Sequence, residues 1–403
     1  MRVLIVTQYF YPENFKSNDI AFELTKRGYK VDALVGIPNY PEGKYYKGYG
    51  IFSKRIEKIN GVRVYRAFQT HRGKKASGLG LLINYLTYAF SASVWALFIS
   101  LFKKKYNAII VFQTSPITQA LPAIILGSLR NVPVYIWVQD LWPNALVSGS
   151  NIDNKIIIKF IDRFTNWVYD KSKMILVSSK LFAESIALKG NYQSKLMYYP
   201  NWCDDFLTKD IVDIPDFPTG FIIILAGNLG VAQDLESILK LAEELRVLDE
   251  VKIVLIGGGS KKEWVENEIG RLNLHDKLYC LGRFPYEMMP SFYKKSNAML
   301  LTLSAKFDDL KMVVPSRLQS YMSAACPVLA MAEGGAADII NEANCGYVVK
   351  GSDYLSLFKI IKEKVLTDKQ SFEKLGQNGR RYYENHFQKD NCIDQLCKII
   401  DNK

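Results

Sequence analysis

One segment of the chain combines the residue types that a phosphate site needs. It leaves a predicted strand and enters a predicted helix at Pro315, Ser316 and Arg317. Proline suits the first turn of a helix, and the free backbone N–H groups of that turn attract anions. Lys306, Lys311 and Arg317 would supply positive charge for a diphosphate. An ordinary basic loop and helix cap would have the same composition, so this pattern alone leaves both interpretations open.

Two glycine-containing turns also join predicted strands to predicted helices. The first contains Gly227, Asn228 and Gly230, and the second is the run of glycines at residues 257–259. Glycine lets the backbone approach a ligand closely, but each turn is equally a tight connection between two elements. Neither matches Gly-x-Gly-x-x-Gly, so a nicotinamide-binding function is not supported.

Asp140 directly follows a predicted strand and lies between Trp137 and Trp142 in the sequence. A carboxylate held between aromatic walls is costly unless it has a partner, which favours a role in a cleft over a structural hydrogen bond. Loops at the same edge of the predicted sheet supply the candidate acceptor-binding residues Asn18, Gln113, Ser115 and Gln139. Asn18 and Ser115 could instead cap helices.

Cysteine, histidine and charge patterns bear on the partners. The six cysteines form no Cys-x-x-Cys pair, only three histidines occur, and no Asp-x-Asp is found, so no metal or cofactor is expected. Scattered thiols suit a reducing cytoplasm. Residues 1–200 hold 27 Lys and Arg against 11 Asp and Glu, whereas residues 201–403 hold 25 against 29. The basic half attracts phosphate groups, and without a recognition motif we expect no nucleic acid partner.

Short apolar runs that alternate with helical stretches must position these residues. In the first half they cover residues 2–8, 31–35, 62–67, 108–112, 134–138 and 174–177, and in the second half residues 221–226, 251–256, 278–281, 298–303, 328–330 and 347–349. Runs that are apolar throughout indicate parallel strands covered on both faces. The sequence therefore predicts two α/β domains, with a proline-punctuated linker after Tyr199 and ligands bound beyond the carboxyl ends of the strands.

Residues 79–102 form an uncharged apolar stretch that, as a helix, would reach ~36 Å. We expect it to pack on the sheet and to dip an outer aromatic face, Tyr85, Tyr88, Trp95 and Phe98, into a membrane interface. Basic residues between 72 and 105 flank it, as binding to an anionic membrane surface requires. A buried core helix and a true transmembrane span remain alternatives.

Taken together, these motifs make the chain resemble a family 4 glycosyltransferase of the GT-B fold, and in particular the bacterial O-antigen and capsule enzymes that include N-acetylfucosamine transferases. The resemblance covers nearly the whole chain. It rests on seven segments in order, which begin at Thr7, Gly36, Gln139, Tyr199, Ala226, Pro315 and Gly376.

The resemblance implies two Rossmann-like domains: residues 1–203 for the acceptor, residues 204–380 for a nucleotide-sugar donor, and helices at 381–403 that return to the first domain. It implies retaining transfer without a metal, and places Asp140 in the acceptor-side catalytic segment and the donor base near Arg283 and Phe284. The family's usual Glu-x7-Glu pair would fall at Met312 and Ser320, and the Arg and Lys of its glycine loop are Asn228 and Gln233 here.

Because those groups are missing, other residues must contact the donor. We expect Arg317 and Lys311 to act with Asp140 in catalysis and Glu333, Gly334 and Gly335 to contact a sugar or ribose hydroxyl. The reaction we expect moves an N-acetylated hexose, such as FucNAc or GlcNAc, from a UDP-sugar to a polyprenyl-diphosphate-linked sugar at the cytoplasmic face of the membrane. A UDP-sugar 2-epimerase and a catalytically silent membrane subunit of an assembly complex are the alternatives.

Overall fold

The computed structural model describes residues 1–73, 78–101, 105–146 and 154–401, and its chain divides into two compact units. Unit 1 consists of Met1–Tyr199 and Ile393–Lys403, and unit 2 of Pro200–Cys392. The return to unit 1 therefore begins later than residue 381. The reason is close helix packing in unit 2: a Cβ on Gly376 of α14 (Lys369–His386) would lie 2.1 Å from the carbonyl oxygen of Ala325. Ala325 follows α11 (Ser316–Ser323), which itself packs against α14.

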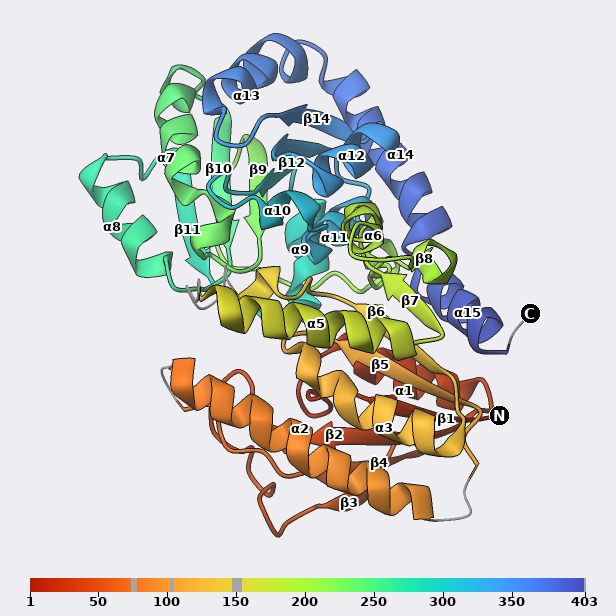
Figure 1. Ribbon diagram of the computed structural model, residues 1–403. Helices are drawn as coiled ribbons and strands as arrows, with labels where there is room; N and C mark the ends of the chain where they lie inside the picture. The colour runs from red at the N-terminus through yellow and green to blue at the C-terminus, as the bar shows by residue number, and fades with distance from the viewer. Residues whose placement is uncertain (74–77, 102–104, 147–153, 402–403) are drawn as a thin grey trace. The chain divides into compact units, whose positions relative to one another are not determined.

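The described part of unit 1 contains a sheet with the order β3-β4-β2-β1-β5-β6-β7-β8 (Figure 1). The strands are β1 (Arg2–Val6), β2 (Lys30–Gly36), β3 (Ile56–Ile59), β4 (Val62–Ala67), β5 (Ala108–Gln113), β6 (Val134–Val138), β7 (Met174–Val177) and β8 (Leu196–Tyr198). All pairs are parallel except β3 with β4. The sequence interpretation missed β3 and β8, because these short edge strands are only partly buried and lack a continuous apolar run.

Helices surround this sheet. They are α1 (Lys16–Lys26), α2 (Gly78–Leu101), α3 (Leu121–Arg130), α5 (Lys155–Lys171) and α6 (Lys180–Ala187), together with α15 (Lys389–Ile400), which begins in unit 2 and ends in unit 1. The last helix is attached to unit 1 by side chains: Arg27 Nε donates to Asp394 at 2.8 Å, and the Tyr29 hydroxyl donates to Asp401 at 2.9 Å.

Unit 2 contains a parallel sheet with the order β11-β10-β9-β12-β13-β14 among the described residues. Its strands are β9 (Phe221–Ala226), β10 (Val251–Ile256), β11 (Leu278–Gly282), β12 (Ala298–Thr302), β13 (Val328–Met331) and β14 (Gly346–Val349). Besides α11 and α14, its helices are α7 (Leu235–Glu244), α8 (Lys262–Arg271), α9 (Met289–Lys294), α10 (Asp309–Met312), α12 (Gly335–Glu342) and α13 (Tyr354–Ile360). Two hydrophobic clusters fill its interior.

Among the parallel strands, the order changes direction once in each sheet. In unit 1 the reversal lies between β1 and β5, and in unit 2 between β9 and β12. In open parallel sheets, ligands bind beyond the carboxyl ends of the strands at such a point, because the connections diverge there to opposite faces. The loops after β1, β5 and β6, and those after β9, β10 and β12, are therefore where function is sought.

Helix α2 covers the sheet of unit 1 and corrects one expectation. Asn84, Tyr88, Ala92, Ala96 and Ile99 are buried along one side, and the Tyr88 hydroxyl donates to Leu34 O at 3.3 Å. Tyr88 is thus part of the core and not of an outer aromatic face. The exposed stripe is mainly aliphatic and comprises Leu79, Leu82, Leu86, Phe90, Val94, Leu97, Phe98 and Leu101. Within the described residues α2 alone is long and apolar enough to cross a membrane, a test that buried core helices also pass.

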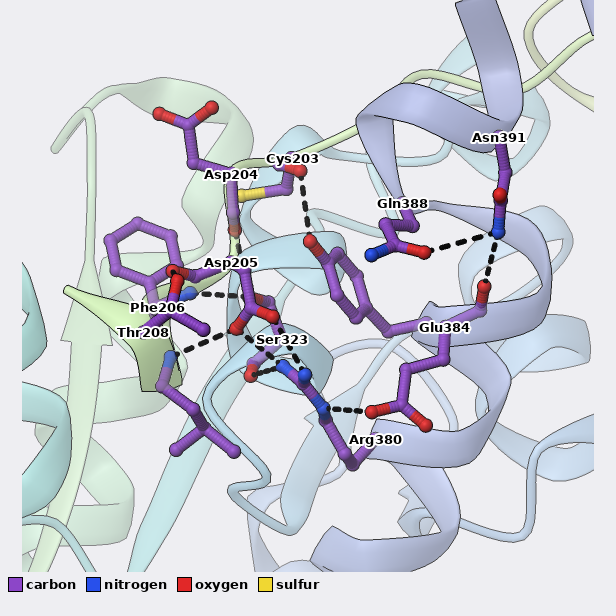
Figure 2. A network of polar contacts seen from close by, with 12 residues as sticks. Cys203, Asp204, Asp205, Phe206, Thr208, Ser323, Arg380, Glu384, Gln388 and Asn391 are labelled. Atoms are coloured by element: carbon purple, nitrogen blue, oxygen red, sulfur yellow. Dashed lines mark hydrogen bonds and ion pairs between the residues drawn. The ribbon is translucent and has the colours of Figure 1, made fainter. Parts of the chain in front are cut away.

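The start of unit 2 is tied to α14 by polar contacts (Figure 2). Arg380 on α14 donates to both carboxylate oxygens of Asp205, at 2.6 and 2.7 Å, and to Ser323 O at 2.8 Å. Arg380 holds the pKa of the Asp205 carboxyl below its usual value. The Tyr383 hydroxyl donates to Cys203 O at 3.1 Å. The Gly376-x-x-Gly379-Arg380 motif is therefore explained by helix packing and this ion pair.

Candidate active site

In unit 2 the loops after β9 and β10 pack backbone against backbone. Gly227 has φ +131° and Gly257 has φ +153°, and a Cβ on Gly257 would lie 1.7 Å from Gly227 O. Leu229 N donates to Gly258 O at 2.8 Å, which holds the two loops together. Only glycine permits both the positive φ and the close approach. These loops form an exposed edge of main chain at the carboxyl end of the sheet, with Gly227 and Asn228 open to solvent.

Arg317 lies beside this edge, one residue into α11. Its Nη2 atom donates to Asn228 O at 3.4 Å, and a Cβ on Gly227 would lie 3.1 Å from the same nitrogen. The Nη1 atom is buried and has no hydrogen-bond partner among the described residues. A buried donor without a partner is costly, so this nitrogen is suited to an anionic ligand.

Tyr321, one helical turn after Arg317, helps to fix this corner. It is fully buried, and its hydroxyl oxygen accepts from Ala226 N at 3.1 Å. Burial raises its pKa, and the nearby Arg317 guanidinium opposes that rise. Side chains four residues apart lie on the same face of a helix. The i, i+4 spacing of Arg317 and Tyr321 was thus a signal that the sequence interpretation did not use.

The other predicted cations of unit 2 lie nearby but already have partners. Lys306 is exposed and pairs with Glu236 at 3.2 Å, and it lines a small hollow with Gly230, Ser304 and Trp264. Lys311 pairs with Asp308 at 3.1 Å. That hydrogen bond and the charge of Glu333 raise the pKa of Lys311.

The remaining predicted donor residues occupy the loops at the same edge. Gly334 has φ +66°, and a Cβ there would lie 2.1 Å from Lys311 O, so the loop before Gly335 packs against the segment that contains Lys311. Pro315 precedes α11 and Ser316 begins it, in an exposed position. After β11, Arg283 is exposed, whereas the Phe284 ring packs on Phe292 at 4.9 Å between centroids.

Gln233, which stands where the family has a lysine, caps its own loop. Its side-chain Oε1 accepts from Gly230 N at 3.0 Å, and its side chain is buried. The structure therefore assigns Gln233 and Gly230 to the geometry of the loop after β9. Of the cations considered for a diphosphate, Arg317 is the one with a buried, unpartnered donor among the described residues.

In unit 1, Asp140 lies at the carboxyl end of β6 with Ser115 and Gln113 beside it. The Ser115 hydroxyl donates to Asp140 Oδ2 at 2.8 Å, and Gln113 Nε2 donates to Asp140 O at 3.3 Å. Burial raises the pKa of Asp140, and the Ser115 hydrogen bond opposes that rise. Gln139 is half-buried, and its backbone N donates to Gln113 O at 2.8 Å. The structure thus brings together three of the four predicted acceptor-binding residues around Asp140.

The fourth, Asn18, lies in the first turn of α1 and holds the loop after β1. Its Oδ1 accepts from Tyr11 N at 2.9 Å, and its Nδ2 donates to Glu13 O at 2.6 Å. Glu13 in the same loop is almost fully buried and accepts from the backbone N of Phe10, Asn39 and Tyr40 at 3.1, 2.8 and 2.7 Å.

Burial raises the pKa of Glu13 to about 7, against the effect of those N–H groups. This carboxyl joins the two N-terminal motifs that begin at Thr7 and Gly36, a pairing that the sequence interpretation missed because the two loops are distant in sequence. Across the described ranges, no cluster of three or more His, Cys, Asp or Glu side chains is arranged to hold a metal ion.

Comparisons with known proteins agree with the fold. Residues 209–382 match the family model described as glycosyl transferases group 1. The chain carries a glycosyltransferase group 1 domain. It is 21% identical, over 320 residues, to WcaI of Escherichia coli K12, which is named as a glycosyl transferase of colanic acid biosynthesis, with 74% of each chain covered.

Solved structures resemble the whole chain. HepE of Anabaena in complex with UDP has a TM-score of 0.72 at 15% identity, with 100% of both chains covered. Sucrose-phosphate synthase from Thermosynechococcus elongatus also has a TM-score of 0.72, at 14% identity, with 100% of this chain and 98% of that chain covered. The protein is a glycosyltransferase with two parallel-sheet α/β domains of the GT-B fold.

Proposed function

We propose that this glycosyltransferase moves an N-acetylated hexose, such as FucNAc or GlcNAc, from a UDP-sugar to a sugar linked to a polyprenyl diphosphate. In this proposal transfer proceeds with retention at the anomeric carbon and without a metal, in the synthesis of a bacterial surface polysaccharide such as O-antigen or capsule. The similarity to WcaI supports the polysaccharide context, and the fold shared with the UDP complex of HepE supports a UDP-linked donor.

The observation that carries the proposal is the buried, unpartnered Nη1 of Arg317 beside the glycine edge of unit 2. A departing UDP gains negative charge on its phosphate oxygens in the transition state. A guanidinium that is held in place and donates to those oxygens lowers the barrier, because its reorientation cost is met during folding. The free backbone N–H groups at the start of α11 would also stabilise the negative charge on the phosphate oxygens.

Unit 1 would bind the acceptor. Asp140, held by Ser115, would contact an acceptor hydroxyl or the donor sugar, and burial raises the pKa of its carboxyl above the usual value. Gln113 is fully buried and supports this loop through its hydrogen bond to Asp140 O, whereas the half-buried Gln139 would offer its amide group to a sugar hydroxyl.

Purified protein incubated with UDP-sugars, with and without a polyprenyl-diphosphate-linked sugar, tests the proposal. We expect a glycolipid product only when the acceptor is present, and a drop in kcat of about 100-fold in Arg317→Ala, in the range found for removal of one transition-state donor. Arg271→Ala on α8, where the arginine is exposed and pairs with Glu268 of the same helix, is the matched control.

Two outcomes would contradict it. A new nucleotide sugar formed without an acceptor would indicate an epimerase, and unchanged turnover in Arg317→Ala would remove Arg317 from the site. Calorimetric UDP binding by the wild type would argue against a silent subunit.

We also propose that the protein works as a peripheral protein at the cytoplasmic face of the membrane. Its contact would be the exposed stripe of α2, in which Leu82, Leu86, Phe90 and Val94 repeat every four residues while Asn84 and Tyr88 hold the opposite side on the sheet. Among the basic flanks, Lys74, Lys75, Lys103 and Lys104 lie outside the described residues. The excess of 27 basic over 11 acidic residues in positions 1–200 favours anionic lipid.

Co-sedimentation with vesicles tests this contact. We expect binding to phosphatidylglycerol-containing vesicles that weakens at least tenfold in Leu86→Glu/Phe90→Glu, because both side chains face outward and charge opposes insertion. Leu188→Glu, at a more exposed leucine directly after α6, should bind like the wild type. Equal binding of the vesicles by the wild type and both variants would contradict the proposal.

A further inference from the structure

A cationic side chain framed by three aromatic rings lies at the carboxyl-end edge of unit 1. The guanidinium carbon of Arg72 is 5.7 Å from the ring centroid of Tyr9, 5.3 Å from that of Tyr40 and 5.8 Å from that of Tyr85. Arg72 Nη2 also donates to the Tyr85 hydroxyl at 3.3 Å. We call these four residues the Arg72 frame.

The frame lies beside Asp140. Tyr9 follows β1, Tyr40 follows β2 and Arg72 follows β4, and the carboxyl ends of these parallel strands meet at one edge of the sheet. Tyr85 comes from α2. Burial raises the pKa of Tyr85, and the charge of Asp140 contributes to that rise, which means that the two side chains are close enough to interact.

No ion pair joins Arg72 to a carboxylate within the described ranges, and its buried Nε atom has no hydrogen-bond partner there. Glu13 is near Tyr9, but its oxygens accept backbone N–H groups of other loop residues. Stacked rings stabilise a guanidinium through cation–π contacts and restrict its rotamers without neutralising it. Arg72 therefore presents positive charge and a fixed donor geometry to whatever enters beside Asp140.

We propose that the Arg72 frame binds the phosphate group of the acceptor. A planar guanidinium donates two parallel hydrogen bonds to phosphate oxygens, and a fixed guanidinium loses little entropy when it does so. The inference rests on the proposed function, since it names the part of the acceptor that unit 1 recognises. It adds a residue that positions the acceptor by its charge, separate from Asp140, which would contact the reacting sugar.

The experiment compares two acceptors that carry the same sugar, one on a polyprenyl diphosphate and one on a neutral alkyl chain. In Arg72→Ala we expect KM for the diphosphate acceptor to rise about 10- to 100-fold, as for the loss of a charge-assisted hydrogen bond, and KM for the neutral acceptor to stay the same. Arg72→Lys keeps the charge and should recover part of the loss. Arg63→Ala, at an exposed arginine near the amino end of β4, is the control.

A KM that is unchanged, or that rises equally for both acceptors, would overturn the inference. If the wild type transfers to neither acceptor, the proposed function fails, and the frame is then judged by calorimetry with geranyl diphosphate while UDP saturates the donor site. Binding that is lost in Arg72→Ala and retained in Arg63→Ala supports the frame, whereas equal binding in all three proteins rejects it.

Discussion

The two carboxyl-end edges of this glycosyltransferase are built by different means. In unit 2, backbone packs on backbone: Gly227 and Gly257 have positive φ and leave no room for a Cβ. In unit 1, buried side chains connect the loops. Gln8 Nε2 donates to Gln69 Oε1 and to Asn84 Oδ1, both at 2.8 Å, and Glu13 binds three backbone N–H groups.

The difference bears on what each edge can recognise. A backbone edge next to one arginine presents N–H groups and positive charge, which suits the phosphates common to all nucleotide sugars. An edge made of side chains can change its ligand with single substitutions. We therefore expect substitutions of the glycines at the edge of unit 2 to affect folding first, and substitutions at the edge of unit 1 to affect selectivity and pH dependence.

Gly257→Ala should have the largest effect on stability. Its Cβ would lie 1.7 Å from Gly227 O, and alanine would also have to adopt φ +153°. The three nearest atoms all belong to the backbone of Gly227, so no flexible group can move aside. We expect the free energy of unfolding of unit 2 to fall by about 4 kcal/mol or more, measured by urea denaturation.

Gly258→Ala is the matched control at the next residue. The nearest atom to its added Cβ is 4.0 Å away, and its φ is not in the left-handed region, so we expect a change of less than about 1 kcal/mol. Equal midpoints for the two variants would show that the edge of unit 2 tolerates side chains after all.

Arg380→Ala should have the next largest effect and should separate stability from binding within unit 2. It removes both hydrogen bonds to the half-buried Asp205 carboxylate and the one to Ser323 O (Figure 2). We expect a loss of about 2 to 3 kcal/mol in the free energy of unfolding, because a partly desolvated carboxylate is left unpaired. The affinity for UDP, measured by calorimetry on the folded protein, should stay unchanged; a fall in affinity would mean that the two sites are coupled.

The sequence predicted most of the fold because its signals are local. The apolar runs at Phe221–Ala226 and Val251–Ile256 have the bounds of β9 and β10, and the helix start at Ser316 follows from the proline before it. The pattern also put Arg317 at that start. The sequence did not predict edge strands such as β3, because their half-exposed residues form no continuous hydrophobic pattern.

What the sequence could not predict is which loops meet. Nothing local in the chain says that Glu13 reaches the backbone of Asn39, or that Tyr9 faces Arg72. Such contacts depend on strand order, which tertiary packing decides. Tertiary packing also decides which side of α2 is buried. Its composition suggested an aromatic face toward a membrane, whereas in the structure Tyr88 is buried in the core. The predicted site residues remain a prediction, with Arg317 and Asp140 best supported by their surroundings.

Glu13→Gln tests the side-chain edge of unit 1 with the smallest expected effect. Burial raises the pKa of Glu13 from 4.5 to about 7 in the folded protein, so between these values the folded state holds a proton that the unfolded state releases. Stability contributed by this proton is present at low pH and falls as pH rises toward about 7. We expect the wild type to lose about 2 kcal/mol between pH 5 and pH 7 from this group, measured by urea denaturation across that range.

Glutamine does not titrate, so Glu13→Gln should remove that slope while it keeps one oxygen for the N–H groups of Asn39 and Tyr40, which share Oε1 in the wild type. Glu42→Gln, at an exposed carboxylate in the neighbouring loop, should retain the wild-type slope. Parallel curves for all three proteins would mean that Glu13 is already ionised throughout. In that case the side-chain edge of unit 1 would depend on the negative charge of Glu13, and its loops would respond to substitution and not to pH.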